Sequence, residues 1–259
     1  MERAGKLSIE LPKPVSLSQF NKLLRFVRND EFLQITKFQG FDEFGQKRKT
    51  HEIPVAVEFV VSRAMRNEFY TRFGITQENE RVGKYGKVEL ISSKIQCNWS
   101  HDRVVVFFES ECPVGVDVVN LNRFSRNEDK FIQMVELMSD FLTAKELEFL
   151  TSHNNEIDRR IEFFGIHWCI KEAVLKTTGD GITEEMNKIV ITEVPLIRIQ
   201  ESRHELQLNT KETQFCVECG GVQLFCNLFH INTQFVCCCA SLKQYDNVTI
   251  QFTHFLSDL

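Results

Sequence analysis

Three charged side chains, Lys171, Glu172 and Lys176, lie in the largely apolar stretch of residues 164–176. In a helix of 3.6 residues per turn, Glu172 and Lys176 share one stripe with Trp168, and Lys171 lies beside them on the same broad face. Fixed ammonium groups can stabilise phosphate charge, and a carboxylate can hold a hard cation or accept a proton. Taken alone, the spacing also fits an ordinary surface ion pair between Glu172 and Lys176.

Two earlier stretches supply further polar groups. Ser100, His101 and Asp102 follow one another, and Asp117 interrupts the β-branched run of residues 114–119. Mg²⁺ prefers oxygen ligands, and one or two protein carboxylates are enough when phosphate and water oxygens complete the octahedron. Asp117 and Glu172 would supply two such carboxylates.

Helical patterns place the charged stripe in the last of several helices. Thr143 and Glu146 have the spacing of a capping box, so a helix is expected to begin there. Gly179 or Gly181 can take the left-handed conformation that ends the following helix. Apolar residues at steps of three and four predict helices at residues 54–73, 131–142 and 157–177, and a shorter one within residues 15–38.

Extended patterns place Asp117 on a strand. Short β-branched runs predict buried strands at residues 104–108 and 114–119. From Lys188 onward the patterns become strand-like, at residues 189–191, 206–208, 215–219, 222–229 and 235–242. Together these elements predict an α/β (α+β) chain with a sheet-rich end.

The composition is that of a folded protein with no basic field. The chain has 259 residues, of which 42% are hydrophobic and 26% charged, and its formal charge is −5. Nucleic acid is therefore a disfavoured partner, although local basic groups can still hold a small anion. The first residues lack the apolar run of a signal peptide, and no stretch reaches the ~20 apolar residues that span a bilayer, so we expect a cytoplasmic protein that does not enter a membrane.

The nine cysteines are expected to be reduced thiols, because they show no even disulfide spacing. Cys216 and Cys219 form a C-x-x-C pair, and Cys226 and His230 could complete a zinc site on paper. No second pair follows at metal-finger spacing. Two strands about a turn at residues 220–221 are the favoured interpretation, and the metal site remains the alternative.

The ordered pieces at residues 98–102, 114–118 and 168–176 resemble the 4′-phosphopantetheinyl transferase superfamily. The resemblance is closest to the larger, monomeric class with two fused halves, and within it to the eukaryotic aminoadipate-semialdehyde dehydrogenase type. It covers about residues 59–182. It implies two similar lobes, residues 1–116 and 117–259, each a small sheet packed with helices, with the active site in the cleft between them.

The resemblance also implies an activity and its partners. Such a protein transfers the phosphopantetheine arm of coenzyme A to a serine of an apo acyl- or peptidyl-carrier domain, or of the carrier domain of an aminoadipate reductase. The products are the holo carrier and adenosine 3′,5′-bisphosphate, which is holo-(acyl-carrier-protein) synthase activity. Mg²⁺ is the implied metal, with Mn²⁺ left open because both suit oxygen ligands.

Residue roles follow from the same resemblance. Asp117 and Glu172 would bind Mg²⁺, and Glu172 would also be the base for the carrier serine. Lys171 would help the departing nucleotide. The expected contacts with the phosphates and nucleotide of coenzyme A are Ser100, His101 at the ribose 3′-phosphate, Lys176, and more weakly Arg81, Lys84 and Lys87.

The sequence departs from the family pattern at Val119, where many members carry a third metal-binding glutamate. The eukaryotic type has an apolar residue there and takes a ligand just after the Ser-His pair, which is Asp102 in this chain. Asp102 is therefore a hypothetical third ligand, with water as the alternative. Two other functions remain open: a degenerate member that binds coenzyme A or a carrier without transfer, and an unrelated Mg²⁺-dependent nucleotide hydrolase.

Overall fold

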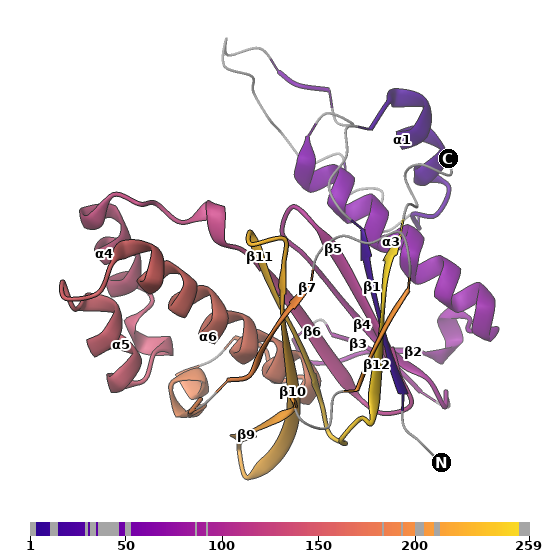
Figure 1. Cartoon of the computed structure of the whole chain (residues 1–259). Helices are drawn as coiled ribbons and strands as arrows, with labels where there is room; N and C mark the ends of the chain where they lie inside the picture. The colour runs from indigo at the N-terminus through magenta and orange to yellow at the C-terminus, as the bar shows by residue number, and fades with distance from the viewer. Residues whose placement is uncertain are drawn as a thin grey trace.

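Two sheets with helices on their outer faces make up the computed structural model (Figure 1). The structure describes residues 4–10, 15–28, 31, 35, 47–49, 53–85, 87–91, 93–182, 184–192, 194–199, 205–209 and 213–253. Within these ranges strands and helices follow one another as an α/β chain, which confirms the expected fold class.

The first sheet has five strands in the order β4-β5-β1-β12-β8. Its strands are β1 (Ala4–Glu10), β4 (Gln96–His101), β5 (Val105–Ser110), β8 (Leu206–Asn209) and β12 (Asn247–Thr253). β1 pairs parallel with β12 and antiparallel with β5. The sequence did not predict β1, because only Leu7 and Ile9 alternate in it with polar residues.

The second sheet has the order β6-β11-β10-β7, and β9 pairs with β10. Its strands are β6 (Val114–Asn120), β7 (Leu196–Ile199), β9 (Phe215–Cys219), β10 (Val222–Ile231) and β11 (Phe235–Ser241). The strand pair expected around residues 220–221 is confirmed, since Gly220 and Gly221 both have positive φ in the turn between β9 and β10. Residues 189–191, which have a strand-like pattern, form no strand, and β7 lies a few residues later.

Five helices and a small hairpin complete the described elements. The helices are α1 (Leu17–Leu24), α3 (Pro54–Phe73), α4 (Glu128–Leu137), α5 (Ala144–Thr151) and α6 (Ile157–Thr178). The hairpin is β2 (Glu80–Val82) and β3 (Val88–Leu90), and short 3-10 turns lie at Gln77–Asn79, Leu121–Arg123, Ser139–Phe141 and Glu184–Lys188. None of the described helices combines the length and the apolar composition that a membrane crossing requires.

The helix predictions hold closely where caps mark the ends. Thr143 accepts a hydrogen bond from the Glu146 backbone while the Glu146 side chain accepts from the Thr143 backbone, which is the expected capping box. α6 ends at Gly179 in the left-handed conformation, with φ of 84°. The helix expected at residues 131–142 is shorter, because α4 stops at Leu137 and continues as a 3-10 turn.

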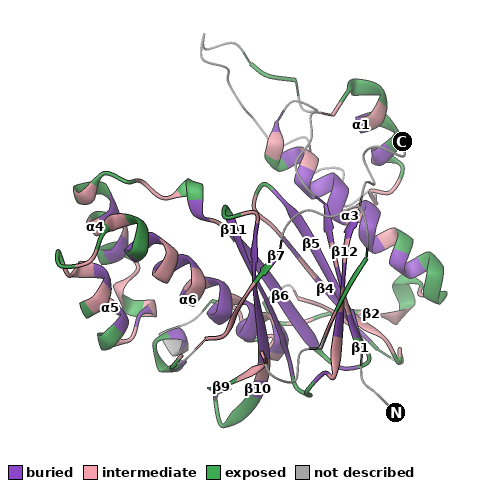
Figure 2. Cartoon of the chain, in the orientation of Figure 1, coloured by how far each residue is buried: buried purple, intermediate pink, exposed green. Residues whose placement is uncertain are grey.

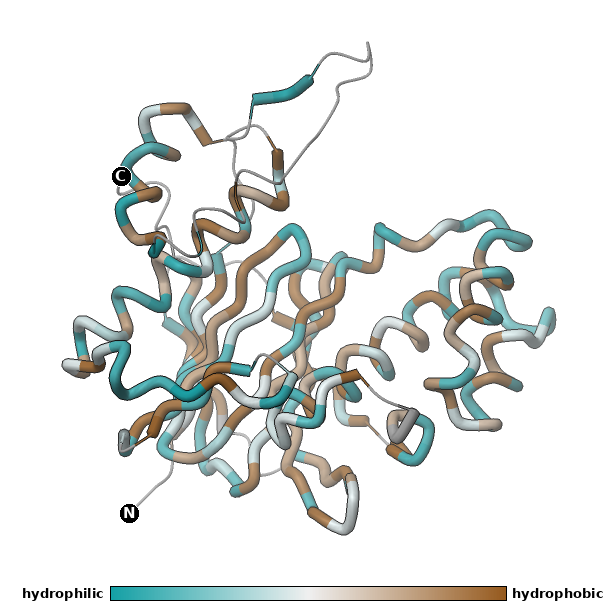
Figure 3. Tube along the Cα trace, turned by 180° about the vertical axis from the view of Figure 1, so that it is seen from behind, coloured by the Kyte–Doolittle hydropathy of each residue, from teal (hydrophilic) through white to brown (hydrophobic). Residues whose placement is uncertain are grey.

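Buried side chains fill three layers between and outside the two sheets (Figure 2). On β5, Val106 and Phe108 face the second sheet, whereas Val105 and Phe107 face α3, as the two-residue period of a strand requires. α4, α5 and α6 cover the opposite face of the second sheet. Hydrophobic residues run through the central strands in the view from behind (Figure 3).

The sheets do not follow the expected division of the chain at residues 116 and 117. β8 and β12 lie after residue 117, yet they join the sheet that holds β1, β4 and β5. Residues 1–116 and 117–259 as separate lobes stay a prediction.

Glycine lets α6 lie directly on β6. A Cβ atom at Gly115 would come within 2.1 Å of the Ala173 carbonyl oxygen and 2.5 Å of the Thr177 nitrogen. A Cβ atom at Gly165 would come within 2.4 Å of the Leu121 side chain. Gly115 therefore needs to be glycine, because it meets backbone atoms of α6, whereas the Leu121 side chain could shift away from an added Cβ at Gly165. The close contact at Gly115 sets Asp117 of β6 opposite α6.

Candidate active site

Asp117, Ser100 and Lys176 meet where β6, β4 and α6 come together. The Lys176 ammonium donates to Oδ1 of Asp117 at 2.6 Å, to the Ser100 hydroxyl at 3.0 Å and to the Val116 carbonyl at 3.2 Å. The Ser100 hydroxyl donates to the same Asp117 oxygen at 2.8 Å. Three residues that the sequence assigned to one site are thus brought together.

Glu172 belongs to the same group, one turn before Lys176 on α6. Burial raises the pKa of Glu172, and the nearby charge of Asp117 raises it further, while Lys176 lowers it. Burial by itself would lower the pKa of Lys176, but the charge and hydrogen bond of Asp117 raise it. Lys176 therefore stays a cation between two carboxylates that repel one another.

A cavity of about 410 Å³ opens beside this group. Glu172, Leu175 and Lys176 of α6 line one part of it, and Lys87 and Val88 of the hairpin line another. The other lining residues include charged side chains from α3, β2 and the segment after α1, together with Trp99 of β4. The cavity thus joins the Asp117–Lys176 region to a second charged region.

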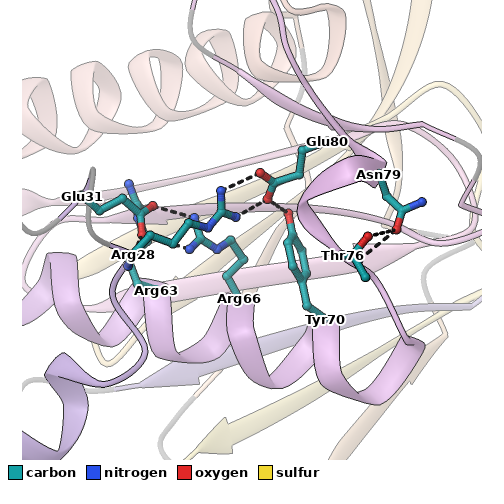
Figure 4. A network of polar contacts seen from close by, with 8 residues as sticks. All are labelled: Arg28, Glu31, Arg63, Arg66, Tyr70, Thr76, Asn79 and Glu80. Carbon is teal, nitrogen blue, oxygen red and sulfur yellow. Dashed lines mark hydrogen bonds and ion pairs between the residues drawn. The ribbon is translucent and has the colours of Figure 1, made fainter.

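That second region is the arginine cluster, defined here as Arg28, Glu31, Arg63, Arg66 and Glu80 (Figure 4). Arg28 forms a bidentate ion pair with Glu80. Arg63 Nε and Arg66 Nη1 both lie 2.7 Å from Oε1 of Glu31. The Tyr70 hydroxyl donates to Glu80 at 2.6 Å.

The sequence did not point to the arginine cluster. Arg63 and Arg66 lie three apart on a predicted helix, where charged residues usually face solvent. Their partner Glu31 is 32 and 35 positions away. Only the packing of the segment after α1 against α3 shows that these charges line a cavity.

Three basic residues of the β2–β3 hairpin were expected to contact coenzyme A, and the structure places them in different surroundings. Lys87 donates to the Thr177 carbonyl at 2.9 Å and lines the cavity, and burial lowers its pKa. Arg81 is exposed and pairs with Glu89 at 2.5 Å. Lys84 is also exposed, with its ammonium 4.7 Å from the centre of the Tyr85 ring. Of these residues, only Lys87 reaches the group around α6.

His101 points away from Ser100, because adjacent residues of a strand face opposite sides. Nδ1 of His101 lies 3.4 Å from a carboxylate oxygen of Glu58 on α3. Neither the His101 side chain nor the Glu58 side chain lines the 410 Å³ cavity. Ser100 and His101 thus lie on opposite faces of β4, and their contacts with the phosphates of coenzyme A stay a prediction.

Asp102 does not join Asp117 and Glu172 in a metal-binding group. After β4 the chain turns sharply, with φ of 66° at Arg103, and directs Asp102 to the end of β6. There one Asp102 oxygen accepts from the Asn120 backbone at 2.9 Å and from Arg123 at 3.1 Å. Within the described residues, no group of three or more His, Cys, Asp or Glu side chains is placed to hold a metal.

The position of Lys171 also needs correction. Its ammonium is fully buried and donates to Glu146 at 2.6 Å and to the Phe141 carbonyl at 3.0 Å. Successive helical residues are about 100° apart, so Lys171 turns toward α5 while Glu172 turns toward β6. A buried ammonium needs an anionic partner, and Glu146 supplies it.

Two carboxylates remain as candidates for a divalent cation. Asp117 and Glu172 are close enough for the charge of one to raise the pKa of the other, a repulsion that a cation would remove. A hard cation needs only one or two protein carboxylates when phosphate and water oxygens supply the rest, so the residues fit Mg²⁺. Val119 cannot contribute, since it is buried in the apolar layer against α6.

Comparison with known proteins places the chain in a family. Residues 113–240 match the model of the 4′-phosphopantetheinyl transferase superfamily. The chain is 31% identical over 107 residues to the holo-(acyl-carrier-protein) synthase of Mycoplasma capricolum, which covers 40% of this chain and 87% of that protein. The chain belongs to the 4′-phosphopantetheinyl transferase superfamily. The matched part holds Asp117, Glu172 and Lys176, whereas the arginine cluster precedes it.

Longer family members match over a smaller share of their length. The rat L-aminoadipate-semialdehyde dehydrogenase-phosphopantetheinyl transferase is 31% identical over 101 residues, 38% of this chain and 32% of that protein. The Xenopus laevis protein of the same name is 35% identical over 120 residues, 42% of this chain and 38% of that protein. The alignments with these curated relatives thus span about a third of their length. A crystal structure of a Plasmodium yoelii holo-ACP-synthase has a TM-score of 0.30 and 18% identity, covering 50% of this chain and 91% of that one.

Proposed function

We propose that this protein transfers the 4′-phosphopantetheine arm of coenzyme A to a serine of an apo acyl- or peptidyl-carrier domain. In this reaction the serine oxygen bonds to the phosphorus that carries pantetheine, and the bond from that phosphorus to adenosine 3′,5′-bisphosphate breaks. The observation that carries the proposal is the group of Asp117, Glu172 and Lys176 beside a charged cavity, within the part of the chain that matches the family.

Glu172 is the proposed base for the carrier serine. A carboxylate whose pKa is raised holds a proton more readily than an ordinary one, and burial beside Asp117 raises the pKa of Glu172. Glu172 lines the cavity and can therefore be reached by a hydroxyl group. The serine proton would pass to Glu172, directly or through a water molecule.

Lys176 and Lys87 are the proposed phosphate contacts near the reacting bond. Both line the cavity, and Lys176 carries a charge that Asp117 maintains. A fixed ammonium favours the negative charge that develops on the leaving phosphate. Lys176, on the same face as Glu172, takes the place that the sequence gave to Lys171.

Asp117 and Glu172 would hold Mg²⁺. When bound, the metal would neutralise charge on the pyrophosphate oxygens. Ser100 would keep the Asp117 carboxylate in place, because its hydroxyl donates to Oδ1. Asp102 is not included as a ligand, since Asn120 and Arg123 donate to its Oδ2 and hold it at the end of β6.

Carrier domains of the family type are acidic helical bundles, and we propose that they dock on the exposed side chains of residues 131–142, which include part of α4. Leu137 on α4 is 83% exposed, whereas Met134 and Met138 pack partly against the core. We expect the carrier to contact Leu137. A carrier domain of an aminoadipate reductase, a monomeric state and a cytoplasmic location also remain predictions.

One assay tests the proposal. Purified protein, coenzyme A, Mg²⁺ and an apo carrier are incubated, and the carrier is measured by intact mass. The proposal requires the carrier to gain the mass of phosphopantetheine, and Glu172→Gln to abolish that gain. Coenzyme A binding without any mass gain would instead identify a degenerate member. Breakdown of coenzyme A or nucleotides without a carrier would identify a hydrolase.

A further inference from the structure

β4 and β6 are the edge strands at which the two sheets meet. β4 ends the order of the first sheet and β6 ends that of the second, and the two strands are in contact. Both strands are described in full, and no backbone ladder joins them. An edge strand has backbone N–H and C=O groups that point away from its own sheet, so these groups of β6 need partners other than a strand.

Val116, directly before Asp117, finds such partners for both of its backbone groups. Its N–H donates to Oδ1 of Asn98 at 2.9 Å, and its carbonyl accepts from the Lys176 ammonium at 3.2 Å. Val116 is fully buried and Asn98 is 9% exposed. A buried N–H without an acceptor is costly, so the Asn98 amide oxygen is needed at this place.

The bond from Asn98 is the first of three that β4 and the turn after it make with β6. Two positions later, the Ser100 hydroxyl donates to Oδ1 of Asp117 at 2.8 Å. Two positions later again, Oδ2 of Asp102 accepts from the Asn120 backbone at 2.9 Å. Side-chain bonds from alternate positions thus take the place of a ladder between the two edge strands.

The opposite face of β4 fixes the direction of Asn98. Cys97 and Trp99 belong to the apolar layer under α3, where the Trp99 and Phe107 rings are stacked with their centres 6.2 Å apart. Side chains alternate between the two faces of a strand, so this packing turns Asn98 toward β6. Asn98 is therefore a rigid point of attachment for Val116.

We infer that Asn98 is a positioning residue for the metal-binding pair: by holding the Val116 N–H, it sets the place of the Asp117 carboxylate opposite Glu172. This inference rests on the proposed function, because it takes Asp117 and Glu172 as the ligands of Mg²⁺. Asn98 acts through the backbone, one peptide away from Asp117. Residues that orient metal ligands in this way change metal affinity by about 10- to 100-fold when they are replaced.

The test replaces Asn98 by leucine, which has a similar size and no acceptor. We expect the Mg²⁺ concentration for half-maximal activity to rise at least about tenfold. We expect kcat for transfer to an apo carrier to fall at least about tenfold, because Asp117 is displaced. KM for the carrier should stay within about twofold of the parent value, since the proposed docking surface lies at residues 131–142.

Asn98→Ala is the second variant, in case the leucine variant does not fold. It leaves room for a water molecule that can accept from the Val116 N–H, but a water molecule does not hold β6 in place. The Mg²⁺ concentration for half-maximal activity should again rise, by at least about threefold. Thermal unfolding shows at which temperatures each variant is folded.

Asp102→Ala is the matched control, because it also removes an acceptor of a β6 backbone N–H. That N–H belongs to Asn120, three residues beyond Asp117. The Mg²⁺ concentration for half-maximal activity should stay within about twofold of the parent value. An unchanged Mg²⁺ requirement in both Asn98 variants overturns the inference, and so does a rise in Asp102→Ala as large as that in Asn98→Leu.

A binding measurement separates the inference from the proposed function. Electron paramagnetic resonance measures Mn²⁺ binding in the presence of coenzyme A without a carrier, so no transfer is needed. If the parent shows no transfer, the proposed function fails and this measurement decides the inference. Mn²⁺ binding at least about tenfold weaker in Asn98→Leu, with Asp102→Ala like the parent, supports the inference. A parent that binds no Mn²⁺, or equal binding by the parent and Asn98→Leu, overturns it.

Discussion

The Lys176 ammonium lies 2.6 Å from Oδ1 of Asp117, the same oxygen that accepts the Ser100 hydroxyl. The two residues are 59 positions apart and come from α6 and β6. Because Glu172 lies one turn away on α6, a single ammonium offsets the repulsion of two carboxylates. This relationship makes Lys176 the residue on which the charge balance of the site depends.

Removing this ion pair should destabilise the protein. We expect Lys176→Met to lower the free energy of unfolding by about 2 kcal/mol, because it leaves Asp117 beside Glu172 without its cation. Adding Asp117→Asn should recover about half of that loss. Urea unfolding of both single variants and the double variant measures the coupling, and additive effects would show that the pair contributes nothing.

Glu172→Gln should abolish transfer and also change how stability depends on pH. The pKa of Glu172 is raised above its ordinary value of 4.5, so the folded state binds this proton more tightly than the unfolded state. Parent stability should therefore fall as pH rises above about 4.5, relative to Glu172→Gln. Urea unfolding at pH 4.5 and pH 7.5 measures the difference in unfolding free energy between the parent and Glu172→Gln. An equal difference at both pH values would contradict the raised pKa of Glu172.

Lys171→Met should act mainly on stability. Burial by itself would raise the pKa of Glu146, but its hydrogen bonds with His167 and Lys171 lower it to about 2. The ion pair therefore stabilises the fold above pH ~4.5 and is lost as pH falls toward 2. We expect Lys171→Met to cost about 3 kcal/mol in urea unfolding at neutral pH.

The kcat of folded Lys171→Met decides its role. If Lys171 only ties α6 to α5, kcat for carrier modification should drop less than about tenfold, far less than in Glu172→Gln. A drop as large as that of Glu172→Gln, at a temperature where the variant is folded, would restore Lys171 to the catalytic group.

Gly115→Ala should disrupt the contact between β6 and α6. The added methyl would lie 2.1 Å from the Ala173 carbonyl oxygen, so the helix must shift. We expect a loss of about 3 kcal/mol and a fall in kcat, because Asp117 and Glu172 move apart. Gly83→Ala is the control, since its nearest contact is an ordinary 3.5 Å and its unfolding should change by less than about 0.5 kcal/mol.

Asp102→Ala should leave the Mg²⁺ concentration for half-maximal activity unchanged. Asp102 instead holds Asn120 and Arg123, so its loss should cost about 1 kcal/mol of stability. A titration of activity against Mg²⁺ measures that concentration. A clear rise in the Mg²⁺ concentration for half-maximal activity would show that Asp102 is a ligand.

Local patterns were enough to predict much of the chain. α3 spans residues 54–73 as its apolar spacing predicted, and the ends of α5 and α6 follow from Thr143 and Gly179. Caps and glycines act over a few residues, so sequence spacing specifies them. β1 and β7 escaped prediction because short strands take their stability from partners distant in the sequence.

The sequence by itself determined the family, through the ordered pieces that hold Asp117, Glu172 and Lys176. Only the tertiary structure decided which charges face each other: it turned Lys171 toward Glu146, directed Asp102 to Asn120, and assembled Arg28, Arg63 and Arg66 around one cavity. Spacing along one helix gives neighbours on that helix, but the partner of a buried charge comes from whichever element packs against it.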